Sequence, residues 1–111
     1  MDAGKYRELI TIEALEGIEK DEDGFESEAW ETYYANYAQA NGLYGSERWA
    51  AAQVQMDNAI RFTFRWNAKL DAVTPKRFRL VFKNRIFTIT NVDNVKFLNR
   101  TVKIDAVEVE T

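Results

Sequence analysis

Apolar and polar side chains alternate residue by residue along most of this 111-residue chain, and no other feature limits its fold so strongly. Residues 59–66 (AIRFTFRW) are the clearest case, because Phe62 and Phe64 alternate with threonine and arginine. This period of two is typical of a strand with one buried face, since successive side chains point to opposite sides of the sheet. We therefore predict a mainly β fold of about six antiparallel strands, which close into a small β-barrel or a compact sandwich with few exposed edges. The alternation recurs in residues 6–14, 30–40, 76–82, 85–92 and 101–110.

The segments between these strands carry turn-forming residues. Residues 15–29 contain two glycines and many carboxylates, which predicts a hairpin-type loop. Residues 67–75 form a connector that ends at Pro75, because proline forces extended geometry on the residue before it. Lys83 and Asn84 form a candidate tight turn, since asparagine tolerates a positive φ angle.

Residues 41–58 (NGLYGSERWAAAQVQMDN) are the exception to the alternation. Gly42 and Gly45 interrupt the preceding strand, Ser46 is placed to cap a helix, and the alanine-rich stretch that follows favours a helix. A helix of about three turns is too short to be stable alone in water, so it must pack on its own barrel or on a neighbouring subunit. We therefore predict one domain over residues 1–111, with a loop that carries one short α-helix inserted at residues 41–58.

Two residue types are missing, and their absence argues against most catalytic chemistry. The chain has no cysteine, which removes disulfides, zinc–thiolate sites and cysteine nucleophiles. It has no histidine, which removes the commonest general base and metal ligand. It also lacks a glycine-rich phosphate loop, a nucleophile elbow and a constrained pair of carboxylates. We expect no enzyme activity and no cofactor.

No apolar run approaches the ~20 residues that span a bilayer, and no secretory signal is present, so we expect no membrane association.

The acidic segment EKDEDGFESE invites comparison with a calcium site. If Gly24 takes the invariant glycine position of an EF-hand loop, the twelfth position falls on Trp30, where that loop requires a bidentate glutamate. No predicted helices flank the segment. A solvated acidic loop is the better interpretation, and we predict no metal site.

Formal charge is divided unevenly along the chain, although the total is only −3. Residues 1–30 hold ten acids and three bases, a net charge of −7, whereas residues 31–111 hold eight acids and twelve bases, a net charge of +4. Such a split favours complementary patches and head-to-tail self-association or docking, although solvated strand faces would give the same pattern. The charges we select for an interface are Asp21, Asp23, Glu26, Arg61, Arg65, Arg77 and Arg79.

A small barrel that binds single-stranded nucleic acid is the alternative function. Such modules stack bases on aromatic side chains beside basic residues, and here Phe62, Phe64 and Trp66 lie among arginines. However, the alternation puts these aromatics on the inward face and the arginines on the outward face, so the rings belong to the core. Exposed basic residues would still allow non-specific contact with phosphates.

Three blocks, taken in order, resemble the head–tail joining proteins of long-tailed bacteriophages and prophages, also called head completion or stopper proteins. The first block is MDAGKYRELITIE. The second is DEDGFESEAWETYYANYAQANGLYGSE, with an Asp-Gly hairpin, a tryptophan, an aromatic strand and the entry into an alanine-rich helix. The third is IRFTFRW…VTPKRFRLVFKNRIFTITNVDN, an arginine-bearing strand followed by a hairpin. The resemblance covers essentially the whole chain and departs from the family at Lys83 and Asn84, where a glycine turn is usual.

The resemblance implies a small β-barrel with a long loop that carries the helix, without catalysis or cofactor. It implies a ring-forming structural protein of the virion neck, assembled in the host cytoplasm, between the portal or its adaptor and the tail-terminator protein. Its role would be to close the channel after genome packaging and to offer a docking surface for the tail, with non-specific contact to the packaged double-stranded DNA. The helix is either a fixed plug or a movable gate. The residues we select for channel closure are Gly42, Gly45, Glu47, Arg48, Trp49, Gln53 and Met56.

Overall fold

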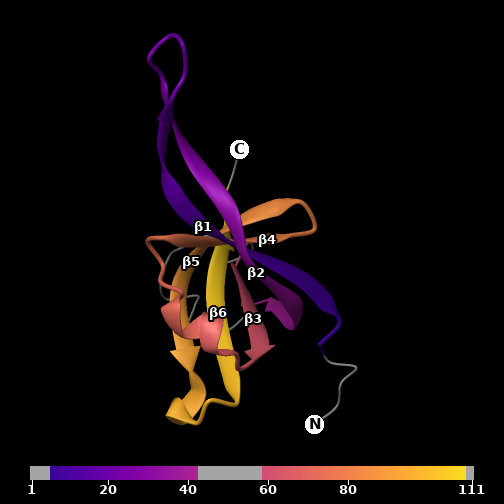
Figure 1. The fold of residues 1–111 in the computed structure, drawn as a ribbon. Coiled ribbons are helices and arrows are strands. Elements are labelled where there is room, and N and C mark those ends of the chain that lie inside the picture. The colour runs from indigo at the N-terminus through magenta and orange to yellow at the C-terminus, as the bar shows by residue number, and fades with distance from the viewer. Residues whose placement is uncertain (1–5, 43–58, 110–111) are drawn as a thin grey trace, which may run out of the picture.

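The computed structural model describes residues 6–42 and 59–109, which form one closed antiparallel sheet (Figure 1). The order of the strands around the barrel is β1-β2-β3-β6-β5-β4, and every neighbouring pair is antiparallel. The predicted mainly β fold of six strands is therefore confirmed. The elements are β1 (Glu8–Lys20), β2 (Glu26–Gly42), β3 (Ala59–Arg65), η3 (Ala68–Ala72), β4 (Phe78–Phe82), β5 (Arg85–Asn94), η4 (Val95–Phe97) and β6 (Thr101–Glu108), where η marks a 3-10 helix.

The core lies inside the barrel and is centred on three phenylalanines. The ring of Phe62 on β3 meets those of Phe82 and Phe87 edge to face, with centroids 5.5 Å apart in both pairs. Edge-to-face geometry suits the quadrupoles of the rings, and each buried ring removes a large apolar area from water. The prediction that Phe62 and Phe64 face inward is confirmed. Other fully buried residues of the core are Ile10, Ile12, Leu70, Leu80, Val102 and Ile104.

The predicted loop at residues 15–29 is wrong for most of its length. The strand β1 continues to Lys20 and β2 begins at Glu26, so the segment is paired strand apart from a register shift between Leu15 and Gly17 and the turn at the tip. A hairpin-type loop was expected because this segment contains two glycines and many carboxylates. However, the two strands form a ribbon that leaves the barrel and has solvent on both faces. They pair through their backbones although neither face of the ribbon is apolar.

This ribbon, which we call the arm (residues 16–28), projects from the barrel (Figure 1). The last β1 residue paired with β4 is Ala14, opposite Phe78. One further backbone bond follows, from the amide of Leu15 to the carbonyl of Arg77, at 2.8 Å. Beyond that point the two strands of the arm pair only with each other, as far as Lys20 opposite Glu26.

The turn at the tip of the arm is held by one carboxylate. Oδ1 of Asp21 accepts hydrogen bonds from the amides of Asp23 and Phe25, at 3.0 and 2.8 Å. The amide of Asp21 in turn donates to the carbonyl of Phe25, at 3.0 Å. Gly24 has a φ of 84°, a left-handed conformation that costs glycine little because it has no Cβ. The tip is therefore an ordered turn.

Two of the predicted connectors also have defined structures. Lys83 and Asn84 form the predicted tight turn between β4 and β5, with φ angles of 52° and 64° that suit the twist of a two-residue hairpin. The connector at residues 67–75 contains the helix η3, which the sequence did not predict. Leu70 and Val73 of this connector are buried in the core, so it closes part of the barrel.

The strand before the insertion is longer than predicted. Gly42 is the last residue of β2 and pairs with Ile60 of β3, so the strand does not break at residue 40. Residues 43–58, with the predicted helix, lie outside the described part of the chain.

Candidate functional site

The arm is the most strongly charged part of the described surface. Its residues 16–28 include seven acids and a single base, Lys20. The three predicted interface acids, Asp21, Asp23 and Glu26, all lie on this arm and are exposed. The structure therefore brings them together at one end of the molecule, within a few residues of the turn.

Two large apolar side chains are exposed on the arm among these acids. Phe25 at the tip is 72% exposed and Ile18 is 64% exposed. An apolar side chain in such a position gains from burial against a partner, and exposed apolar groups at a polar rim are typical of interaction sites. Neither residue was selected from the sequence, although an isolated phenylalanine within an acidic segment was the available signal.

The predicted interface residue Arg61 is already bound within the chain. Its Nε and Nη2 donate to the two carboxylate oxygens of Asp105, at 2.7 and 3.1 Å, across the β3–β6 pair. Asp105 is only 7% exposed, so the guanidinium of Arg61 must offset the cost of burying this negative charge. The hydrogen bond that Arg61 donates to Asp105 raises the pKa of Arg61 above its ordinary value, so the guanidinium keeps its charge. The pair stabilises the barrel, and few donors of the Arg61 guanidinium remain to bind a partner protein.

The predicted interface residue Arg79 is also engaged. Its Nε lies 2.7 Å from the carboxylate of Glu13 on the neighbouring strand β1. Its guanidinium carbon lies 4.3 Å from the centre of the Trp30 ring, a cation–π contact. Arg79 therefore joins the base of the arm to β4.

The other two predicted arginines keep exposed side chains. Arg65, at the end of β3, stacks over the ring of Tyr6 at 4.9 Å. Nη2 of Arg77 donates to the carbonyl of Leu15 at 3.3 Å, beside the base of the arm. The four predicted arginines thus do not form one patch. Only Arg77 lies beside the base of the arm and is exposed, and its neighbour Lys76 is exposed as well.

A hollow of about 350 Å³ lies at the base of the arm, between β2, the segment before β4, and β5. Its apolar lining includes Trp30 and Phe78, both half-buried, and charged residues stand at its rim. We call it the arm-base groove. The residues that line it are Glu28, Trp30, Pro75, Lys76, Phe78, Arg79, Ile86, Thr88 and Val109.

The loop between β5 and β6 is a second exposed apolar site, at the end of the molecule opposite the arm (Figure 1). Phe97 is 89% exposed and has a φ of 54°, which is unfavourable for a bulky side chain. Leu98 beside it is also exposed, and Lys96 and Arg100 flank the pair. Strain of this kind persists where the surrounding structure enforces it and is commoner at functional positions.

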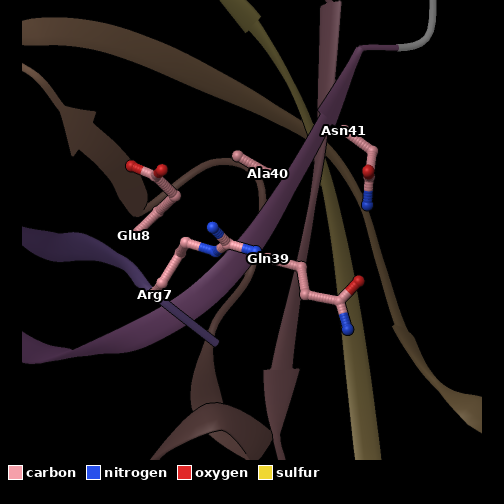
Figure 2. Close-up of a pocket in the computed structure, with 5 residues that line it drawn as sticks. All are labelled: Arg7, Glu8, Gln39, Ala40 and Asn41. Carbon is pink, nitrogen blue, oxygen red and sulfur yellow. The ribbon is translucent and has the colours of Figure 1, made fainter. Parts of the chain in front are cut away.

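A polar hollow of about 300 Å³ lies where β2 leads toward the insertion. Figure 2 shows Arg7 and Glu8 on one side of it and Gln39, Ala40 and Asn41 along β2. Its lining offers amide and charged groups and only a little apolar surface, from residues such as Ala40, so it does not resemble a small-molecule site.

The residues selected for channel closure are only partly placed by the structure. Gly42 ends β2, beside the polar hollow. Gly45, Glu47, Arg48, Trp49, Gln53 and Met56 lie outside the described residues.

Neither a metal centre nor a membrane span is found in the part of the chain that the structure describes. Within residues 6–42 and 59–109, no three acidic, histidine or cysteine side chains come together as metal ligands would. Within the same residues, no helix has the length and apolar character needed to cross a membrane.

Comparisons with known proteins agree with this geometry. The chain is similar over 97% of its length to 96% of protein SF1141 from Shigella flexneri 2a, whose solution structure superposes with a TM-score of 0.68 at 19% sequence identity. At that identity the likeness concerns the fold alone. No curated protein sequence matches the chain. The family model described as phage head completion protein matches residues 1–109, and the chain therefore belongs to the phage head completion protein family.

Proposed function

We propose that this chain works in the neck of the virion, where it joins the DNA-filled head to the tail and helps to close the portal channel after packaging. Membership of the family makes it a structural component of the phage, concerned with completion of the head. The finer role, the neck position and the ring of copies are our proposal.

The observation that carries the proposal is the presence of two different exposed ends on one rigid barrel. The acidic arm, with Phe25 at its tip, lies at one end, and the basic loop with Phe97 and Leu98 lies at the other (Figure 1). A protein that joins two assemblies needs two such surfaces. We propose that one meets the portal or its adaptor and the other meets the tail-terminator protein.

The proposed channel closure is assigned to the insertion at residues 41–58. Gly42 at the end of β2 and Ala59 at the start of β3 anchor its two ends on adjacent strands of the barrel. Both ends of the insertion are therefore attached to the same part of the barrel wall. Exposed basic residues of the described surface would allow non-specific contact with the packaged DNA.

Deletion of the gene tests the proposal. Particles that lack this protein are expected to package DNA, lose it and bear no tails, whereas expression of the wild-type chain in trans restores tailed, filled particles. Electron microscopy and nuclease protection of the packaged DNA measure both properties. Tailed, filled particles from the deletion would contradict the proposed role.

Hydrogen exchange on the free protein separates a fixed plug from a movable gate. Protection at residues 49–56 equal to that at residues 62–66 would favour a plug that is packed on the barrel. Much faster exchange at residues 49–56 would favour a segment that opens locally.

The burial of the aromatic side chains weighs against the alternative function, a module that binds single-stranded nucleic acid. Phe62 and Phe64 are fully buried, and Nε1 of Trp66 donates to Asp71 at 3.0 Å. Stacking of bases requires exposed ring faces, which Phe62 and Phe64 do not offer.

A further inference from the structure

We propose that the tip of the arm docks in the arm-base groove of a second copy of this chain, with Phe25 inserted between the apolar side chains of that groove. This inference deepens the proposed function, because it names the contact between copies. Only the assembly of the copies into a ring rests on the proposed function. Both halves of the contact are present on every copy.

The tip presents an apolar ring in a fixed position. The hydrogen bonds that Asp21 makes to the amide and carbonyl of Phe25 hold the turn, while the phenyl ring itself is 72% exposed. A side chain presented on an ordered turn loses little conformational entropy when it binds. Aromatic anchors of this kind dominate the energetics of many interfaces.

The groove offers the matching apolar surface. Trp30, Pro75 and Phe78 line it, and its volume of about 350 Å³ is large enough for a phenyl ring. The guanidinium of Arg79 covers one face of Trp30 and is itself bound to Glu13, which fixes the position of the indole. The groove is therefore formed before a partner arrives.

The charges around the two halves are mostly of opposite sign, although the acid Glu28 also lines the groove. Beside Phe25 the tip carries Asp21, Glu22 and Asp23, all exposed. Beside the groove stand Lys76 and Arg77, also exposed, in a segment from residue 76 to residue 85 that holds five bases and no acid. Complementary charges of this kind steer association and fix the orientation of the partners.

The tip cannot reach its own groove. Five residues of extended strand separate Phe25 from Trp30 of the groove, about 17 Å at ~3.3 Å each, and pairing with β1 keeps them extended, so the ring cannot fold back between Trp30 and Phe78 of its own copy. The contact must therefore join two copies, and it pairs different surfaces on each. Contacts of that type are heterologous, and they generate a ring when the rotation between copies closes.

Disulfide trapping tests this contact directly, because the chain has no cysteine of its own. Glu26→Cys, which keeps the Phe25 ring, and Lys76→Cys are made as separate proteins, mixed at high concentration and oxidised. The matched control replaces Lys76→Cys by Asn99→Cys, an exposed position in the β5–β6 loop. We expect the first mixture to give several-fold more cross-linked heterodimer than the control, and the double variant to give a ladder of oligomers on non-reducing gels.

Charge reversal supplies the second arm of the experiment. Because position 76 already carries the cysteine, the charge is reversed at its neighbour, and Arg77→Glu is introduced into the Lys76→Cys protein. We expect the yield of heterodimer to fall by roughly threefold. Introduction of Glu22→Lys and Asp23→Lys into the Glu26→Cys protein is expected to restore the yield; Asp21 is left intact because it builds the turn. Equal yields in the test and control mixtures, or a predominance of Glu26→Cys homodimers, would overturn the proposal.

The test is independent of the deletion experiment. If cross-linking fails while particles without the protein still lose their DNA, the arm contact is wrong and the neck role stands. If cross-linking succeeds while those particles stay filled and tailed, the contact stands and the neck role is wrong.

Discussion

The barrel and the arm share the strands β1 and β2, yet the two regions are held by different forces. In the barrel, Ile10 and Ile12 of β1 are fully buried against the inward faces of other strands. In the arm, the same strand carries Ile18 in solvent and pairs only with β2. An isolated two-stranded hairpin is marginally stable at best, so the arm depends on its anchoring in the barrel. The barrel therefore supplies stability, and the arm supplies a surface.

Loss of a core ring is the change expected to have the largest effect. Phe62→Ala removes a fully buried side chain that contacts both Phe82 and Phe87, and we expect it to lower the free energy of unfolding by about 3–5 kcal/mol. Phe25→Ala at the tip is the matched control, with an expected change below about 0.5 kcal/mol. Urea denaturation measures both, and equal effects would contradict the division between barrel and arm.

Loss of the partly buried ion pair is expected to have the next largest effect. Arg61→Met leaves the carboxylate of Asp105 buried without its partner, and we expect a loss of about 2 kcal/mol in the free energy of unfolding. Arg85→Met is the control, because Arg85 pairs with Glu108 at 2.9 Å but is largely exposed. A surface pair of that kind contributes at most about 1 kcal/mol. Comparable losses in the two variants would mean that the burial of Asp105 does not matter.

Excision of the arm tests the comparison most directly. Replacement of residues 16–29 by Asn-Gly joins Leu15 to Trp30, which are already opposite each other, through a turn that suits a hairpin. We expect the free energy of unfolding to change by less than about 1 kcal/mol, because few buried contacts are lost. Tailed particles should disappear when the shortened protein replaces the full chain. A shortened protein that no longer folds would show that the arm is part of the folding unit.

A substitution in the loop opposite the arm is expected to have the smallest effect, and to raise the free energy of unfolding rather than lower it. Phe97→Asn replaces a bulky residue at positive φ by one that tolerates it, and we expect the free energy of unfolding to rise by roughly 0.5 kcal/mol. Leu98→Asn is the control, since Leu98 is also exposed but has a φ of −91°. Thermal denaturation measures the difference, and a loss of stability in Phe97→Asn would show that the ring makes a contact worth more than the strain.

The sequence predicted those features that depend on local pattern. The alternation of apolar and polar residues located all six strands, because each strand of a barrel has one buried and one solvent-exposed face. The turn at Lys83 and Asn84 followed from the tolerance of asparagine for positive φ. The predicted loop at residues 15–29 was wrong because a ribbon in solvent on both faces has no alternation to detect. The burial of Leu70 in a short 3-10 helix gave no periodic signal either, since five residues are too few to show one.

The sequence by itself determined the class of fold and the family, since period-two alternation and the order of short motifs belong to the chain alone. Only the tertiary structure decided which charges are free to meet a partner. Arg61, Arg77 and Arg79 look equivalent along the chain, but strand register puts Arg61 opposite Asp105 and Arg79 opposite Glu13, whereas Arg77 stays exposed at the base of the arm. Register arises from pairing between distant segments, so the partner of each charge is fixed only when the barrel closes.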